Sequence, residues 1–519
     1  MPDHQAHDRA AGNLRICLRI PAQADFQTPE GKSALKVLSV ASEAVPLIKT
    51  GGLADVAGAL PSALAPNGVE VTTLLPGYPS VLKAIGRSRA VHAWDSLLGV
   101  PARLLSAKID GHPLLVLDAP ALFTRDGAPY TDGAGRDWGD NWHRFSAFGR
   151  AAADIAGGAM VSRGKAKRYD VVHAHDWQAA MACAYLRFAP FGGDEGRVPS
   201  VVTVHNMAFQ GWFGSEVFPG VGLPAEAWTM EGVEYHGGLG MLKAGLACAD
   251  AVTTVSPTYA REIRAANFGM GLEGLVIARG NAVSGILNGI DTALWNPAED
   301  AALAARYSAR TLDKRKANKR ALEAEFGLDE DDGPLFIAVT RLTWQKGMDV
   351  LPEVLDHLVG IGGRLALLGS GDRAIERQLR EGAARHPGRV GLRFGYDEDL
   401  SHRMQGGGDA ILIPSRFEPC GLTQLYGLAY GCLPVVSRTG GLADTVIDAN
   451  PAALAAGVAT GIQFDGVHYD ALSAALTRTV ELWNEPDVWA ALQKNAMKAD
   501  FSWTASGAAY ARLYRKLAA

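Results

Sequence analysis

The segment from Pro414 to Gly427, which reads PSRFEPCGLTQLYG, holds the residues best suited to chemistry in this sequence. The apolar run Ala410–Ile413 before it is typical of a buried parallel strand. Apolar residues at helical spacing after the turn predict a helix from Leu422 to Tyr430. The Glu418 carboxylate therefore lies between a strand's carboxyl end and a helix start, where open α/β sheets bind ligands. Taken alone, Glu418 is more simply interpreted as a helix cap, so the other motifs have to be weighed with it.

Lys49 begins a second candidate site, because it precedes Gly51 and Gly52 at the turn between a predicted strand, Lys36–Ala41, and a predicted helix from about Leu53. Glycines let a backbone approach a phosphate closely, the helix start adds partial positive charge, and the lysine adds a full charge. The spacing differs from the Gly-x4-Gly-Lys-Ser/Thr loop of P-loop proteins. An ordinary strand-to-helix turn with a solvated lysine explains this segment equally well.

Two further cations, Arg341 and Lys346, lie on the loop that follows the predicted strand Leu335–Val339. A guanidinium fork beside an ammonium group is suited to binding a diphosphate, and two cations on one sheet-end loop favour that role over surface solvation. No Asp-x-Asp pair suggests a divalent metal site, so lysine and arginine would neutralise the diphosphate. No Gly-x-Gly-x-x-Gly loop with a partner acid stands out, which argues against a dinucleotide oxidoreductase.

Strands alternate with helices in both halves of the chain, which predicts two mostly parallel sheets covered on both faces. The predicted strands are Lys36–Ala41, Val69–Leu75, Leu114–Leu117, Val171–His173, Val201–Val204, Ala251–Val255, Leu335–Val339, Leu365–Leu368, Val390–Phe394, Ala410–Ile413 and Leu433–Val436. Asp176, His205 and Asn206 follow strands of the first half, and such strand ends share one edge of a sheet. A single histidine after a strand is more often structural, but several polar strand ends together favour a site.

The length of 519 residues is too great for one hydrophobic core, so we expect at least two domains. Residues 1–35 are predicted to be a disordered N-terminal extension. Residues 36–297 and 298–480 are predicted to form N-terminal and C-terminal Rossmann-like domains, and the helices of 481–519 to pack back on the first domain.

Composition excludes some classes of partner. The net charge of −5 gives no reason to expect a nucleic acid or an anionic membrane as partner. The sequence has no run of about 18 apolar residues, so no membrane-spanning helix is expected. Five cysteines without metal-type spacing indicate a reducing compartment, and we expect a cytoplasmic protein.

Seven motifs in order resemble those of bacterial glycogen synthase and plastid starch synthase. They are KTGGLADV from Lys49, HAHDW from His173, TVHN from Thr203, NGID from Asn288, RLTWQKG from Arg341, the Pro414–Gly427 segment, and TGGLAD from Thr439. The match runs from about Lys36 to the C-terminus.

The resemblance implies a GT-B fold, in which two Rossmann-like domains face each other across a central cleft. It implies a retaining transferase that moves glucose from ADP-glucose to the non-reducing end of an α-1,4-glucan such as glycogen, releasing ADP. The first domain would lie on the acceptor side, and the second would bind the nucleotide sugar. No covalent enzyme intermediate, cofactor or metal ion is implied. The alternatives are a related synthase that uses UDP-glucose, a plastid starch synthase, and a catalytically silent glucan-binding protein.

The resemblance also implies a role for each matched residue. The donor-binding residues would be Lys49, Gly51, Gly52, Asn288, Arg341, Lys346, Tyr396, Cys420, Gly421, Leu422 and Thr423, and the catalytic ones Glu418, Asp176, His205, Arg341 and Lys346. Arg341 and Lys346 would hold the diphosphate, Glu418 would grip the glucose hydroxyls, and Asp176 would lie by the reacting centre.

One position departs from the wider pattern of retaining enzymes with this fold. Many of them carry a second glutamate eight residues after the first, and this chain has Tyr426 there. The tyrosine fits the glycogen synthase branch and argues against the UDP-sugar and GDP-sugar transferases that carry both glutamates. It leaves the contact to the donor ribose unassigned.

Overall fold

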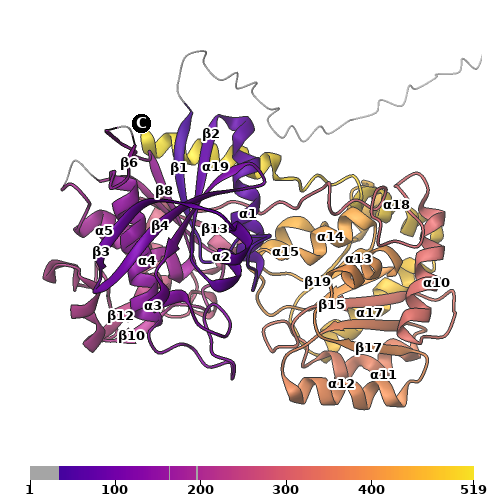
Figure 1. Cartoon of the computed structure of the whole chain (residues 1–519). Coiled ribbons are helices and arrows are strands. Elements are labelled where there is room, and N and C mark those ends of the chain that lie inside the picture. The colour runs from indigo at the N-terminus through magenta and orange to yellow at the C-terminus, as the bar shows by residue number, and fades with distance from the viewer. Residues whose placement is uncertain (1–33, 163, 194–196) are drawn as a thin grey trace, which may run out of the picture. The chain divides into compact units, whose positions relative to one another are not determined.

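Two β-sheets, both flanked by helices, form the framework of the chain (Figure 1). The computed structural model describes residues 34–162, 164–193 and 197–519. The predicted N-terminal extension, 1–35, lies outside the described residues up to position 33 and stays a prediction.

The first sheet has the strand order β14-β13-β9-β8-β1-β2-β5-β4-β3. Its strands are β1 (Leu35–Val40), β2 (Val69–Pro76), β3 (Arg89–Leu97), β4 (Val100–Ile109), β5 (His112–Asp118), β8 (Val171–His175), β9 (Ser200–Val204), β13 (Ala251–Thr254) and β14 (Val283–Gly285). Its helices include α1 (Gly52–Leu64), α2 (Pro79–Ile85), α4 (Asn141–Gly157), α5 (Asp176–Phe188), α6 (Met241–Cys248), α7 (Pro257–Glu262) and α9 (Glu273–Ala278). The seven strands from β14 to β5 pair in parallel.

Side-chain alternation along β1 explains why helices cover both faces of this sheet. Val37 packs with residues of α1 and of the C-terminal helix α19 (Trp503–Ala518), whereas Leu38 and Val40 join the core formed by α4 and α5. Successive side chains of a strand point to opposite faces, so a strand that is apolar at nearly every position requires both layers.

The hairpin of β3 and β4, which was not predicted from the sequence, adds two antiparallel strands at one edge of the sheet. Leu98 and Gly99 form its turn, both with positive φ (49° and 91°). A leucine at the first of these positions gives no turn signal, since glycine, asparagine and aspartate are the usual residues there.

The second sheet is parallel throughout and has the order β17-β16-β15-β18-β19-β20. Its strands are β15 (Leu335–Val339), β16 (Arg364–Gly369), β17 (Val390–Phe394), β18 (Ala410–Ile413), β19 (Leu433–Ser437) and β20 (Ile462–Phe464). Its helices include α10 (Arg315–Phe326), α11 (Leu351–Gly360), α12 (Arg373–Arg385), α13 (Glu398–Gly407), α14 (Thr423–Tyr430), α15 (Gly440–Thr445), α16 (Pro451–Ala455) and α17 (Tyr469–Trp483).

The chain crosses between the two sheets twice, and the crossings lie side by side. Ile290 pairs with Ser502, and the Ile290 amide donates to the Phe501 carbonyl at 2.8 Å. Ile290 and Trp295 already belong to the second hydrophobic core, so the first crossing comes before the boundary predicted at residue 297.

The last two helices divide between the sheets, which differs from the prediction that 481–519 pack on the first domain. In α18 (Pro486–Ala496), Trp489 and Leu492 lie in the second core, where Trp489 meets Trp483 of α17 edge to face at 5.2 Å. Only α19 packs on the first sheet, through Tyr510 and Tyr514. Buried aromatic residues such as Trp489 and Tyr510 show in the sequence that these helices pack, but not which core each helix joins.

Within the ranges that the structure describes, no helix is long and apolar enough to cross a membrane.

Candidate active site

Strand order reverses direction between β15 and β18, and the two loops that leave these strands carry the predicted diphosphate and sugar ligands. Arg341 and Lys346 follow β15, and Glu418 follows β18. The carboxyl ends of two strands at such a switch point frame the usual ligand site of an open α/β sheet. The loops are tied together, because Arg416 donates its amide to the Gln345 carbonyl at 2.8 Å.

The Lys346 ammonium donates to Oε2 of Glu418 at 2.5 Å, and the Ser415 hydroxyl donates to the same oxygen at 2.9 Å. Only 6% of the Glu418 surface is exposed. Helix α14 has Leu422 at its N-cap and no side-chain cap. The simpler interpretation of Glu418 as a helix cap is therefore wrong, and its carboxylate is instead one half of a largely buried ion pair.

The glycines of the TGGLAD motif explain how Glu418 is held from behind. Gly441 donates its amide to the Glu418 carbonyl at 3.1 Å. Gly440 has φ +44°, and a Cβ at this position would lie 1.9 Å from the same carbonyl oxygen. Only glycine fits such a close backbone approach, so the second glycine pair serves to place the Glu418 loop.

Arg341 is exposed, and its side chain forms no hydrogen bond or ion pair with any residue in the described part of the chain. Lys346 already has Glu418 as counter-ion, so the exposed guanidinium supplies the uncompensated positive charge of this loop. Thr423 is the first residue of α14, and Gly421 before it has φ +72°. A cation beside a helix start forms an arrangement suited to a phosphate group.

Tyr396 follows β17 on the same edge of the second sheet and is 74% exposed. Its hydroxyl donates to Glu398 at 2.9 Å. Partial desolvation of the hydroxyl and its bond to Glu398 both raise the tyrosine pKa, and the charge of Asp55 from the first half adds to the rise. An exposed aromatic ring at the same edge of the sheet as the cationic loop can stack on a flat heterocycle.

In the first sheet the order reverses between β1 and β8, and Lys49 lies on the loop after β1. The Lys49 ammonium pairs with Asp55 at 2.8 Å. Gly51 is the N-cap of α1, and a Cβ at Gly52 would lie 4.0 Å from Cδ1 of Leu422. The two predicted donor loops, one from each half, are therefore neighbours at this point.

Buried Glu43, which sequence reasoning missed, shapes the Lys49 loop. Its carboxylate accepts hydrogen bonds from the Thr50 amide, from the Thr50 hydroxyl at 2.6 Å, and from the Tyr130 hydroxyl. The one available signal was an acidic residue just after a buried strand, where a charge needs several partners.

Asp176 and His205 lie together at the carboxyl ends of β8 and β9. The His205 amide donates to Oδ1 of Asp176 at 2.6 Å. Asp176 has φ +55°, a conformation that aspartate rarely adopts and that is often found at functional sites. Burial raises the pKa of the Asp176 carboxyl to about 7.

Three histidines keep the surroundings of Asp176 neutral, of which His173 and His175 are buried and His205 is half-buried. His175 Nδ1 lies 3.0 Å from His205 Nε2, and His175 Nε2 lies 3.2 Å from the Ser39 hydroxyl. Burial lowers the pKa of His205 to about 3, so its imidazole is uncharged at neutral pH. His173 is tied in turn to the Tyr514 hydroxyl of α19 at 2.7 Å.

Asn288 and Cys420 join the two halves behind the Glu418 loop. The backbone N–H of Asn288 donates a hydrogen bond to the Cys420 sulfur. Burial raises the pKa of this thiol to about 12. The side-chain Oδ1 of Asn288 is buried and has no partner among the described residues. An unsatisfied buried oxygen is costly, so it marks a place where a ligand hydroxyl can bind.

Four hydrogen bonds link α7 of the first half to α15 of the second. Asp444 accepts from the Thr258 amide at 2.7 Å and from its hydroxyl at 2.6 Å. Glu262 accepts from the Gly440 amide and the Thr439 hydroxyl, both at 3.0 Å. Each helix thus supplies the carboxylate that caps the start of the other. We call these four bonds the reciprocal caps.

Tyr259, another residue that the sequence did not single out, lies between the two groups of predicted site residues. Its hydroxyl accepts the Met207 amide at 3.0 Å. Burial raises the tyrosine pKa, and the charges of Asp176, Glu262 and Glu418 raise it further. Carboxylates from both halves therefore act electrostatically on one hydroxyl.

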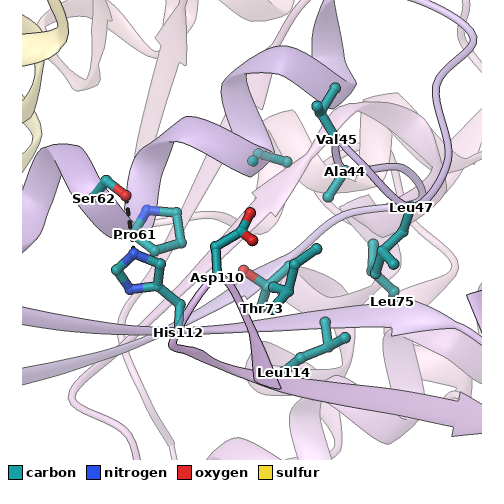
Figure 2. A pocket seen from close by; sticks show the side chains of 13 residues that line it. Ala44, Val45, Leu47, Pro61, Ser62, Thr73, Leu75, Asp110, His112 and Leu114 are labelled. Carbon is teal, nitrogen blue, oxygen red and sulfur yellow. Dashed lines mark hydrogen bonds between the residues drawn. The ribbon is translucent and has the colours of Figure 1, made fainter. Parts of the chain in front are cut away.

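A pocket lined by residues under the Lys49 loop is a separate feature (Figure 2). It is lined by Val45 and Leu47 of the loop, Pro61 of α1, Asp110 of the turn before β5, and His112 at the start of β5. Its volume is about 50 Å³, and none of the predicted site residues lines it. Ligand pockets are usually several times larger, so this one is too small for a nucleotide sugar.

Comparison with protein families divides the chain at a similar place to the two sheets. Residues 36–278 match the model of the starch synthase catalytic domain, and residues 319–496 match that of glycosyl transferases group 1. Together these models cover most of the chain.

Curated relatives match over nearly the whole length. A glycogen synthase of Novosphingobium aromaticivorans is 71% identical over 485 residues, which covers 93% of this chain and 99% of the relative. A glycogen synthase of Mesorhizobium japonicum is 55% identical over 483 residues, with the same coverage.

A solved structure gives the same result in three dimensions. The catalytic domain of starch synthase IV from Arabidopsis thaliana, bound to ADP and acarbose, superposes with a TM-score of 0.82 at 31% identity, covering 94% of this chain and all of that one. A sucrose-phosphate synthase of Thermosynechococcus elongatus, at 18% identity and a TM-score of 0.55, shares the fold alone. The predicted GT-B fold and the predicted resemblance are both confirmed, and the chain belongs to the glycogen synthase family of glycosyltransferases.

Proposed function

We propose that this protein transfers glucose, with retention of configuration, from ADP-glucose to the non-reducing end of an α-1,4-glucan such as glycogen, and releases ADP. The observation that carries the proposal is the buried Lys346–Glu418 ion pair at the switch point of the second sheet, with the exposed Arg341 guanidinium on the same loop. Relatives named glycogen synthase and a starch synthase solved with ADP and acarbose support it.

The cations act on the leaving group. Arg341 and Lys346 hold the diphosphate and stabilise the negative charge that develops as the bond between sugar and phosphate loosens. The amides at the start of α14, with Thr423, and the loop of Lys49, Gly51 and Gly52 complete the contacts to the donor phosphates. Tyr396 provides the surface for the nucleotide. We propose that no metal ion or cofactor takes part.

Glu418 grips the glucose from one side, with the backbone of Cys420, Gly421 and Leu422. His205 and the unsatisfied Asn288 oxygen hold it from the other half of the chain. Glu418 is already engaged by Lys346 and Ser415, which suits it to accepting hydrogen bonds from sugar hydroxyls and not to attacking the sugar.

Asp176 lies by the reacting centre and forms no covalent bond to the sugar. In this mechanism a donor phosphate oxygen accepts the proton of the incoming glucan hydroxyl, which attacks from the face that the phosphate leaves. Catalysis then consists largely of positioning and of charge stabilisation. We further propose that the protein acts in the cytoplasm.

Tyr426 favours ADP-glucose over UDP-glucose as donor. Its ring stacks on Trp295 at 3.6 Å with an interplanar angle of 10°, so an apolar surface stands where many UDP-sugar transferases carry a carboxylate. The related synthase that uses UDP-glucose is therefore the second candidate.

Transfer of labelled glucose to glycogen by the purified protein, with ADP-glucose and UDP-glucose in parallel, tests the proposal. We expect a clear preference for ADP-glucose, and digestion of the product by an α-1,4-specific amylase reports retention. A preference for UDP-glucose would overturn the choice of donor. Glycogen binding without transfer from either donor would indicate a silent glucan-binding protein.

A further inference from the structure

A small antiparallel sheet leaves the main fold between β9 and α6, next to the reacting centre. It consists of β10 (Trp212–Gly214), β12 (Gly238–Gly240) and β11 (Glu234–Tyr235), in that order. Nothing in the donor site described above uses this sheet.

Two aromatic side chains on the segment between β9 and α6 are unusually exposed. Phe209 is 50% exposed and Trp212 is 51% exposed, although tryptophan and phenylalanine are mostly buried in folded proteins. Phe209 ends a turn that begins at Asn206, whose side chain accepts the Ala208 amide at 3.0 Å. Large exposed apolar groups close together mark interaction sites more often than isolated ones do.

The Trp212 indole is held in a fixed orientation. Its Nε1–H donates to the Tyr235 carbonyl at 2.9 Å, and a Cβ at Gly238 would lie 2.6 Å from Cε2 of the indole. One side of the ring therefore packs on the backbone of the neighbouring strand, and half of its surface stays in solvent. A ring that is already ordered loses little conformational entropy when a ligand stacks on it.

The segment that carries Trp212 packs against the segment that carries Asp176. Gly211 has φ +62°, and a Cβ there would lie 2.4 Å from Cε3 of Trp177. Trp177 follows Asp176, whose carboxylate binds the His205 amide. The packing of Trp177 on Gly211 thus places Trp212 next to the segment that carries Asp176.

Charge excludes several classes of ligand for this surface. The segment 205–240 contains no lysine and no arginine, and the stretch 206–214 carries no charged residue at all. Nucleic acids and other polyanions need cationic side chains, which this segment lacks. A neutral ligand with apolar faces fits, and a chain of pyranose rings has such faces in its axial C–H groups.

We infer that Phe209 and Trp212 form an acceptor platform, on which sugar rings of the α-1,4-glucan stack while its non-reducing end reaches the site beside Asp176. This inference rests on the proposed function and extends it to the acceptor. The donor side is cationic and the acceptor side is neutral and aromatic, so each substrate has its own recognition chemistry.

The test measures glycogen affinity by retardation in native gels that contain glycogen, together with the separate KM values for glycogen and for ADP-glucose. Trp212→Ala should raise the glycogen dissociation constant and the glycogen KM about tenfold, and leave the ADP-glucose KM unchanged. Trp212→Phe, which keeps an aromatic face, should lose no more than about threefold in affinity. Phe191→Ala, which removes a 39% exposed aromatic side chain after α5, is the matched control and should change neither constant.

Phe209→Ala is a second, independent variant, since its ring lies in a turn and outside β10. Glycogen affinity within about twofold of the unmodified protein in both Trp212→Ala and Phe209→Ala would overturn the platform. The two proposals can fail separately. If the unmodified protein transferred no glucose from either donor, and Trp212→Ala still weakened glycogen binding, the proposed function would be wrong and the acceptor platform would be supported.

Discussion

Replacing Lys346 separates the catalytic role of the Lys346–Glu418 pair from its structural role. The ammonium and carboxylate lie 2.5 Å apart, with 17% and 8% of their side chains exposed. At an effective dielectric constant of about 20, two unit charges at that distance attract by about 7 kcal/mol. Much of this attraction is offset by the desolvation of the two ions, and breaking one partner of a buried pair typically costs about 3 kcal/mol.

Lys346→Met should therefore lower the free energy of unfolding by about 3 kcal/mol, because it leaves Glu418 buried without a counter-ion. It should also lower kcat by a factor of about 100 to 1,000, the usual effect of removing one group that stabilises a developing negative charge. Coupling ADP release to a spectrophotometric assay gives kcat, and urea unfolding gives the stability.

The double variant Lys346→Met, Glu418→Gln tests the reasoning. A neutral amide no longer needs a counter-ion, so most of the lost stability should return, whereas kcat should stay at least about 1,000-fold low because both substrate contacts are altered. If the double variant regained near-normal kcat, the pair would be structural and the assignment of Lys346 to the diphosphate would be wrong. Lys316→Met, which removes an exposed ion pair with Asp332, is the control and should leave both quantities unchanged.

Three further predictions concern Asp176, Gly440 and Lys49. The pKa of Asp176 is raised from 3.8 to about 7, so between these pH values the folded state binds more protons than the unfolded state. The free energy of unfolding should therefore fall as the pH rises from about 4 to about 7. Asp176→Asn should flatten that pH dependence in urea titrations. Gly440→Ala should raise the donor KM more than about tenfold, because the added methyl displaces the Glu418 carbonyl, whereas Gly274→Ala on α9, with open space around it, should leave KM unchanged in the same assay. Lys49→Ala should raise the ADP-glucose KM with little change in kcat, and a large fall in kcat with an unchanged KM would contradict a role in ground-state donor binding.

Much of this architecture was predictable from the sequence, because strands that are apolar at nearly every position indicate parallel sheets. Once β15 and β18 are recognised as parallel strands, the loops carrying Lys346 and Glu418 are expected on one edge. Strand order was not predictable from periodicity, and it is strand order that makes these two loops neighbours.

Other features depend on contacts between distant residues and leave no local signal. Glu43 reads as an ordinary acid after a strand, yet its three hydrogen bonds fold the Lys49 loop. Tyr259 reads as a core residue of a short helix, and only the structure shows carboxylates from both halves near its hydroxyl. The charged run from Ala304 to Phe326 has a helical pattern, yet α10 begins only at Arg315, because the Asn318 side chain binds the Ala305 backbone and holds the preceding segment as a loop.

The reciprocal caps make the joint between the halves reversible at low energy. If α7 and α15 separated, the amides of Thr258 and Gly440 would exchange carboxylate oxygens for water, a loss of about 1 kcal/mol for each cap. Such a joint can open to admit a bulky polymer and close again with the free energy that a bound nucleotide sugar supplies. Because Gly440 and Glu418 belong to the same half, opening would leave them together and would move His205 of the first half away from the sugar. An open enzyme would then bind the donor weakly and hydrolyse little of it.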